Sequence, residues 1–333
     1  MNCKIIRREH IFKTETFFPQ CHASTVEMMP CGGVAAAWFA GSHEKAADVA
    51  IWFSVLADIK NGRWSVPRKI AEHPGVPCWN PVLFVNAEEL IIYYKVGHEI
   101  TEWCTYTTTS SDGGATWTAA SELVPGDASG GRGPVKNKNL RLKNGIILAP
   151  TSVEKPLWEC FVDISRDDGK TWVKSATVPR KHNEFTGTGI IQPTLWEGKG
   201  GLTHMLMRSS EGCIYQSYSA DFGGTWSVAE RTELPNNNCG IDAIKLADGR
   251  VVLAYNAVAG NWAARSPIAL IISEDDGRTW GEPIVLEHTP CDPKINIEDT
   301  EFSYPAIVAR DNEVFITYTW KRRTIAFWCI EIC

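Results

Sequence analysis

The chain has 333 residues, of which 44% are apolar and 22% are charged, and its formal net charge is −6. This composition is typical of a globular protein with a large core, and the mild acidity argues against a general nucleic-acid binder. No apolar run is long enough to span a bilayer, and the first residues lack the apolar core of a signal peptide, so we expect a cytoplasmic protein with no membrane partner.

The eleven cysteines are scattered along the chain and form no Cys-x-x-Cys pair. The sequence therefore suggests neither a zinc site nor a disulfide framework. We expect reduced thiols, many of them buried as small apolar groups, and no metal or other cofactor.

Short apolar runs bounded by turn residues recur in sets of three, which predicts β-strands. The sets lie at 23–28, 34–39 and 48–55; at 81–85, 90–95 and 103–110; at 140–142, 145–150 and 159–165; at 193–196, 202–207 and 213–219; at 243–246, 251–256 and 268–273; and at 305–309, 314–320 and 325–330. The opening segment 4–12 belongs to no set, and the chain shows no helical period of useful length.

An eight-residue pattern, Ser-x-Asp-x-Gly-x-Thr-Trp, follows the third strand of four sets, at 110–117, 165–172, 219–226 and 273–280. A degenerate copy follows the first set and ends at Trp64, where a fourth strand, 64–70, is expected to begin. Successive closing tryptophans lie 53, 55, 54 and 54 residues apart. So regular a period indicates one supersecondary unit repeated around an axis or along a line.

Each residue of the pattern suits a hairpin turn. The aspartate accepts backbone N–H bonds, the glycine supplies a positive φ, and the tryptophan is large enough to wedge the turn against its neighbour. We therefore interpret these acidic residues as turn formers rather than catalytic carboxylates.

Four complete Asp-boxes at this spacing resemble the sialidase (neuraminidase) superfamily, specifically its sialidase-like proteins with Asp-box (BNR) repeats. The resemblance covers essentially the whole chain and implies an all-β, six-bladed β-propeller of four-stranded antiparallel blades, as a single domain over 1–333. Segment 4–12 is then expected to supply the outer strand of the last blade, which closes the ring. The motif is more specific for the fold than for an activity.

The Asp-box lies between strands three and four of a blade, so the starts of strand one and the ends of strand two gather at the opposite end, around the axis. Every start of strand one carries a polar or ionisable residue. These residues are His22, Asn80, Asn137, Gln192, Asp242 and Tyr304.

Basic residues at the same end predict a mouth that binds an anionic ligand. They are Lys95, Arg132, Lys136, Lys138, Arg208, Arg265 and Arg322. Four tryptophans there, Trp79, Trp103, Trp158 and Trp262, would either stack on sugar faces or fill the core.

The resemblance also implies roles for individual residues. Superfamily members hold a substrate carboxylate with three arginines, use a tyrosine activated by a glutamate as the nucleophile, and use an aspartate as acid/base. Segment 302–307 is similar to the nucleophile region and points to Tyr304, while 207–210 resembles the second arginine and points to Arg208. Arg265 or Arg322 would be the third arginine, and Asp48 lies in the loop of the acid/base residue.

Two positions depart from the superfamily pattern. His22 stands where the first arginine belongs, and Gln192, which cannot act as a base, lies near the expected glutamate. His22 is then a candidate proton shuttle. The acidic residues Glu298, Asp299 and Glu301, just ahead of Tyr304, are candidates for the missing carboxylate.

These features predict an exo-acting glycoside hydrolase for a terminal acidic or uronate-linked sugar, with His22, Asp48, Glu301 and Tyr304 as catalytic candidates. Two alternatives remain open at this point. One is a uronate-directed oligosaccharide lyase on the same propeller, and the other is a glycan-binding propeller without catalysis. The departures from the pattern count against sialic acid itself as the substrate.

Overall fold

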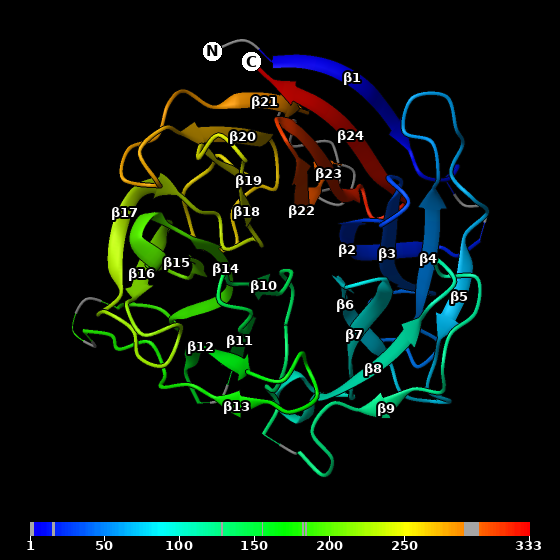
Figure 1. Ribbon diagram of the computed structural model, residues 1–333, viewed down its shortest axis with the longest axis horizontal. Helices are drawn as coiled ribbons and strands as arrows, with labels where there is room; N and C mark the ends of the chain where they lie inside the picture. The colour runs from blue at the N-terminus through cyan, green and yellow to red at the C-terminus, as the bar shows by residue number, and fades with distance from the viewer. Residues whose placement is uncertain are drawn as a thin grey trace.

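The computed structural model describes residues 3–14, 17–127, 129–154, 156–181, 183, 185–289 and 300–333. Six four-stranded antiparallel sheets stand around a central axis as the blades of a β-propeller (Figure 1). The predicted all-β, six-bladed architecture is confirmed. No helix among the described residues is long and apolar enough to cross a membrane.

Each blade runs from an inner strand beside the axis to an outer strand at the rim (Figure 1). The first three blades are β2 (Gln20–Met28), β3 (Val34–Gly41), β4 (Ala50–Leu56) and β5 (Arg68–Ala71); β6 (Cys78–Asn86), β7 (Glu89–Val96), β8 (Cys104–Ser110) and β9 (Ser121–Glu122); and β10 (Leu140–Arg141), β11 (Ile147–Glu154), β12 (Trp158–Ser165) and β13 (Val173–Lys174). The next two are β14 (Ile190–Glu197), β15 (Thr203–Ser209), β16 (Cys213–Ser219) and β17 (Glu230–Pro235); and β18 (Asp242–Lys245), β19 (Val251–Asn256), β20 (Ile268–Ser273) and β21 (Ile284–Glu287). Two short 3-10 turns are η1 (Ile100–Glu102) and η3 (Lys199–Gly201).

The last blade joins the two ends of the chain. It consists of β22 (Phe302–Arg310), β23 (Glu313–Trp320), β24 (Thr324–Ile332) and β1 (Cys3–His10). Strand β1 is antiparallel to β24, from the pair Cys3 and Ile332 to the pair His10 and Ala326, so the blue and red strands lie side by side in Figure 1. The N-terminal segment thus supplies the outer strand of the last blade, and β24 is paired on both edges.

The Asp-box turns owe their shape to the box aspartate. In the box after β20, one carboxylate oxygen of Asp275 accepts hydrogen bonds from Ser273 Oγ at 2.8 Å and from the backbone N–H of Thr279 at 2.8 Å. The other oxygen accepts from Thr279 Oγ1 at 2.7 Å. The boxes of Asp112, Asp167 and Asp221 repeat these three bonds.

The box glycine and tryptophan after β8 pack the second blade against the first. Gly114 has a φ of 86°, and a Cβ there would lie 2.4 Å from the ring of Phe53 in the preceding blade, so no larger residue fits. Trp117 meets the same Phe53 ring edge-on, with 5.2 Å between ring centroids. Because the box tryptophan faces the neighbouring blade, the fourth strand starts after it. Strand β5 begins at Arg68 and not at Trp64 as expected.

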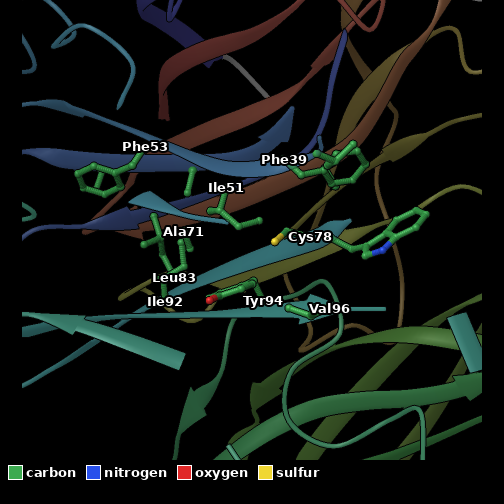
Figure 2. Packing of buried hydrophobic residues seen from close by; sticks show 14 of the residues in the cluster. Phe39, Ile51, Phe53, Ala71, Cys78, Leu83, Ile92, Tyr94 and Val96 are labelled. Atoms are coloured by element: carbon green, nitrogen blue, oxygen red, sulfur yellow. The ribbon is translucent and has the colours of Figure 1, made fainter. Parts of the chain in front are cut away.

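Apolar side chains fill the space between adjacent blades. Between the first two blades, Figure 2 shows Phe39, Ile51 and Phe53 facing Leu83 and Ile92, all of them buried. These residues alternate along their strands with residues that face the other neighbour, as expected for sheets buried on both faces. The described cysteines are free thiols, and most are buried.

The box aspartates make the fold sensitive to acid. The hydrogen bonds from Thr279 and Ser273 lower the pKa of Asp275 to about 2. A lowered pKa stabilises the folded state above the unfolded pKa of about 4, and this stabilisation disappears as the pH falls through about 2. Asp275→Asn should therefore unfold at lower urea than wild type at neutral pH, and the gap between the two midpoints should shrink as the pH falls from about 4 to about 2.

Glu274→Gln is the matched control, because Glu274 is the adjacent, exposed acid of the same box. It should leave the urea midpoint close to that of wild type at every pH. Equal effects of Asp275→Asn and Glu274→Gln would contradict the role given to the box hydrogen bonds.

Candidate active site

Four inner strands share a bulge at the end away from the Asp-boxes. Their register with the second strand of the blade breaks after His22, Trp79, Ile191 and Ser303. The first residue of each bulge is left-handed, with φ of 53° at Ala23, 35° at Asn80, 52° at Gln192 and 54° at Tyr304. The strands therefore begin three residues earlier than predicted, at Gln20, Cys78, Ile190 and Phe302.

A proline follows the left-handed residue in three of these bulges, as Pro81, Pro193 and Pro305. Proline has no N–H to contribute to the ladder and is tolerated in a sheet at such a bulge. A left-handed residue other than glycine costs about 1–3 kcal/mol, and such strain is concentrated at functional sites. The strained residues Gln192 and Tyr304 meet each other from different blades, with 3.3 Å between Gln192 Nε2 and the Tyr304 hydroxyl.

The Tyr304 hydroxyl lies among hydrogen-bond donors. Its oxygen accepts from Arg208 Nη1 at 2.9 Å and from Gln192 Nε2 at 3.3 Å. Arg208 is held in turn by Gln192 Oε1 at 3.0 Å and by Asn238 Oδ1 at 2.7 Å. With two N–H donors on the oxygen, the hydroxyl proton is left for another acceptor.

His22 packs against Tyr304, with 4.3 Å between the ring centroids. Its Nδ1 lies 2.9 Å from Thr319 Oγ1 and 3.9 Å from Glu301 Oε1, and the side chain is 3% exposed. Burial first, and then the positive charges led by Arg322 and Arg265, hold the pKa of His22 well below its usual range. The ring is therefore neutral at neutral pH, and gaining a proton there is unfavourable while the surrounding positive charges are not offset.

Glu301 lies between two arginines. Its Oε1 accepts from Arg265 Nη1 at 2.7 Å and its Oε2 from Arg322 Nε at 3.0 Å, while Ser303 Oγ donates to Oε1 as well. Burial by itself would raise the pKa of Glu301, but the charges of Arg265 and Arg322 outweigh it and lower the pKa. Glu301 is ionised at neutral pH and is a poor proton donor.

Lys136 and two asparagines connect the inner strands across the axis. Lys136 Nζ donates to Asn137 Oδ1 at 2.8 Å, to the Ile241 carbonyl at 3.2 Å and to the Pro305 carbonyl. Burial lowers the pKa of Lys136 to about 8. Asn137 Nδ2 donates to the Gln192 carbonyl at 3.1 Å, and Asn80 Nδ2 donates to the Val135 carbonyl at 3.0 Å. Lys136 and Asn137 thus hold the backbone at Pro305 and Gln192, and Asn80 holds the backbone at Val135.

Two of the four tryptophans lie at the mouth. The guanidinium carbon of Arg208 is 5.6 Å from the ring centroid of Trp158 and 5.4 Å from that of Trp262. Trp262 is 63% exposed, so its ring is open to a ligand. Trp79 and Trp103 are buried and pack on each other, with 5.3 Å between ring centroids, and they serve as core.

Several predicted site residues lie away from the side chains that contact Tyr304. Lys95 is fully buried and donates to Thr105 Oγ1 at 2.7 Å and to the Arg132 carbonyl at 2.5 Å, while Arg132 pairs with Asp163 at 2.8 Å. Both residues stabilise the contact between the second and third blades. Burial lowers the pKa of Lys95 to about 7.

Asp242 and Lys138 lie deeper along the axis. They pair at 2.9 Å, and Asp242 Oδ2 also accepts the backbone N–H of Ile307 at 3.0 Å. Lys138 lines a cavity of about 650 Å³ beside the hairpins that join first and second strands, at the opposite end from the mouth. Asp242 therefore links inner strands, and no hydrogen bond or ion pair within the described residues joins it to Tyr304.

Asp48 occupies the exposed loop between β3 and β4. Its carboxylate accepts from the Ser42 backbone N–H at 3.0 Å and from Ser42 Oγ at 2.8 Å. The same loop carries Glu44, which pairs with Arg322 at 2.5 Å and lines a shallow recess beside His22. Glu298 and Asp299 lie outside the described residues.

Three partners of the predicted site residues were not predicted from the sequence, namely Asn238 beside Arg208, Thr319 beside His22 and Glu44 beside Arg322. The run Asn236-Asn237-Asn238 was a signal, because three asparagines in sequence suit an irregular, hydrogen-bonding backbone. Asn238 indeed has a φ of 58°. Nothing in the sequence pointed to Thr319, since a threonine within a strand is common.

Within the described residues, no group of three or more His, Cys, Asp or Glu side chains is placed to hold a metal ion.

A family model described as a BNR repeat-like domain matches residues 32–316. A protein of unknown function from Dyadobacter fermentans has a similar structure, with a TM-score of 0.75 and 17% identity over 99% of both chains. The Hadza microbial sialidase Hz136 gives a TM-score of 0.79 at 15% identity, over 98% of this chain and 68% of its own. The NanB sialidase of Streptococcus pneumoniae gives 0.76 at 15% identity, over 99% and 70%. These similarities show a shared fold, and no curated protein matches the sequence.

The environment of His22 predicts its titration. Because burial and four nearby cations lower its pKa, the His22 ring should stay neutral as the pH falls through about 6.5, where an ordinary histidine gains a proton. Histidine side-chain NMR shifts recorded on both sides of that pH, with His22→Asn used to assign the signal, would show a flat curve for His22. A midpoint near the ordinary value of about 6.5 would contradict the proposed environment.

Proposed function

The chain belongs to the BNR repeat-like domain family, and we propose that its axial mouth is the active site of an exo-acting glycoside hydrolase for a terminal acidic or uronate-linked sugar. The observation that carries this proposal is the Tyr304 hydroxyl, whose oxygen faces Arg208 and Gln192 while its ring contacts His22. Three different blades supply these groups, and the backbone at both Gln192 and Tyr304 is strained.

An anionic substrate is supported by the charges around Tyr304. Lys136, Arg208, Arg265 and Arg322 gather there on a protein whose net charge is −6. Such a concentration of positive charge at a mouth attracts anions, and guanidinium groups bind carboxylates with good geometry. The exposed Trp262 ring beside Arg208 offers an apolar face for a sugar ring.

In the hydrolytic reaction, Tyr304 would attack the anomeric carbon, or stabilise its positive charge, as the glycosidic C–O bond breaks. His22, whose ring contacts Tyr304, would take the tyrosine proton once a bound anionic substrate offsets the positive charges that lower the pKa of His22. Asp48, on the exposed loop between β3 and β4, is the carboxyl group proposed to protonate the leaving oxygen. Water then attacks the anomeric carbon and gives a proton to Asp48, while any bond from the sugar to Tyr304 breaks and the tyrosine oxygen regains its proton from His22. Arg208 holds the phenolic oxygen throughout.

A uronate-directed lyase is the second candidate, and one observation favours it. Within the described residues, no carboxylate hydrogen-bonds to the Tyr304 hydroxyl, which instead accepts from Arg208 and Gln192. An oxygen held only by donors keeps its proton for another acceptor, and once deprotonated it can remove the proton from the carbon beside a uronate carboxylate. A carbon–carbon double bond then forms as the glycosidic bond breaks, and the leaving oxygen takes up a proton.

Tyr304→Phe keeps the ring but removes the reacting oxygen. We expect kcat on uronate-capped oligosaccharides to fall at least about 100-fold, and His22→Ala to reduce it strongly as well, with melting temperatures near that of wild type. Tyr218→Phe is the matched control, because Tyr218 is an exposed tyrosine of β16, and it should keep full activity. A reducing-sugar assay run beside ultraviolet absorbance would measure the rate and separate hydrolysis from elimination, since only elimination gives an unsaturated, absorbing product.

Two results would contradict the proposal. One is full activity of Tyr304→Phe on a substrate that wild type cleaves. The other is tight binding of an acidic oligosaccharide with no cleavage across sialosides, uronate-capped oligosaccharides and rhamnosyl-glucuronates, which would indicate a glycan-binding propeller.

A further inference from the structure

A cavity of about 650 Å³ opens at the end of the axis away from the mouth. Five of the six blades line it, through residues in or beside the inner strands β2, β10, β14, β18 and β22, which surround the axis in Figure 1. Small-molecule sites in proteins usually have volumes of about 300–1,000 Å³. The cavity is therefore large enough for a ligand of its own, and the reaction proposed at the mouth does not use it.

The wall of the cavity combines apolar side chains with a few polar ones. Leu195, Leu246 and Val308 line it from three different blades and are buried, and Ile244 lies beside them, half-buried. Small-molecule sites commonly have such walls, in which a small number of polar groups fix the orientation of the ligand.

The charged residues of the lining leave little net charge. Three of them are paired within the protein, as Lys138 with Asp242 at 2.9 Å, Lys245 with Asp276 at 2.7 Å, and Asp248 with Arg250 at 2.7 Å. The other four are two lysines, Lys143 and Lys199, and two glutamates, Glu27 and Glu197. Because these charges balance, the cavity suits a neutral ligand better than an anion or a cation.

Glu27 adds a group that can donate as well as accept. Burial raises its pKa to about 7, so this carboxyl group is partly protonated near neutral pH. Its Oε1 accepts the backbone N–H of Met28 at 2.8 Å. A protonated carboxyl group donates one hydrogen bond, which a ligand hydroxyl can accept.

Asn139 is the polar residue of the lining that the protein leaves unsatisfied. Its side chain is 6% exposed, and neither its amide nitrogen nor its amide oxygen has a hydrogen-bond partner within the described residues. Burial raises the pKa of Tyr93, and the Asn139 amide partly opposes that rise, which places the amide near the Tyr93 hydroxyl. A carboxamide has two donor and two acceptor positions, so a contact with Tyr93 leaves most of them free. Buried polar groups are normally hydrogen-bonded, and this amide therefore indicates a partner that the protein does not supply.

We propose that the cavity is a second ligand site, which binds a neutral sugar through two adjacent hydroxyl groups on the Asn139 amide. One hydroxyl can donate to the amide oxygen while its neighbour accepts from the amide nitrogen. The C–H groups of the sugar ring then pack on the apolar wall. This inference does not depend on the activity proposed for the mouth, because the two sites lie at opposite ends of the axis.

Methyl NMR of wild type, titrated with glucose, galactose, mannose and xylose, tests the site. At least one of these sugars should give saturable shifts of the Leu195, Ile244 and Val308 methyl groups, with a Kd in the millimolar range. Ile191, beside Gln192 at the mouth, reports separately on any sugar that binds there. Methyl signals at the cavity that respond to none of the four sugars would overturn the proposal.

Asn139→Leu removes the amide and keeps the size of the side chain. It should raise the Kd at the cavity at least about tenfold, because a donated and an accepted hydrogen bond are both lost. Its melting temperature should equal or exceed that of wild type, because the amide has no hydrogen-bond partner within the described residues. An unchanged Kd, or a large fall in the melting temperature, would contradict the role given to Asn139.

Lys199→Gln is the matched control, because Lys199 is an exposed lysine of the same lining. It should leave the Kd of the neutral sugar within about threefold. Inorganic phosphate is the anionic probe, and it should not shift the cavity methyl groups. Shifts caused by phosphate and lost in Lys199→Gln would identify an anion site and overturn the proposal.

A crystal of wild type soaked in the sugar that binds gives an answer even if Asn139→Leu does not fold. We expect two sugar hydroxyl groups within hydrogen-bond distance of the Asn139 amide. Ordered water is the other occupant that could satisfy this amide. Water alone on the amide after the soak would show a hydrated cavity and overturn the assignment.

Discussion

The closed ring is the constraint on which the rest of the structure depends. Pairing of β1 with β24 fixes the last blade, and the last blade carries Tyr304 on β22. Tyr304 reaches Gln192 and Arg208 of the fourth blade across the axis and His22 of the first blade beside it. Each of these distances changes if the blades spread apart. The geometry of the site therefore depends on the packing between blades, to which box residues such as Gly114 and Trp117 contribute at the other end.

The polar residues at the two ends of the blades differ in what they bind. At the Asp-box end, the aspartate carboxylates accept hydrogen bonds from N–H and O–H groups of the same turn. At the mouth, polar groups bind partners from other blades, and the backbone adopts left-handed conformations that cost energy locally. A local hydrogen bond needs only the right spacing in sequence, whereas a bond between blades needs the whole ring.

Electrostatics at the mouth distinguish residues that look alike in sequence. Arg208, Arg265 and Arg322 are all arginines near one tyrosine, but two of them face Glu301 and one faces neutral groups. The same cations lower the pKa of His22 and keep Glu301 ionised, so neither side chain behaves as it would in water. The protonation states that matter for the proposed reaction are thus set by residues distant in sequence.

The sequence by itself determined the architecture. Asp-boxes about 54 residues apart predicted six blades, and a leftover N-terminal strand predicted how the ring closes, because turn chemistry and strand patterns are local properties. It also placed Tyr304, His22 and Arg208 at one end, since the start of the first strand and the end of the second strand lie together in any such blade. Only the tertiary structure decided that Lys95 and Arg132 belong to a contact between blades, that Asp242 lies deeper in the axis, and that Glu301 binds two arginines. The physical reason is that a side chain's partner and charge state depend on which blades meet around it, and spacing along one strand carries no information about the strand across the axis.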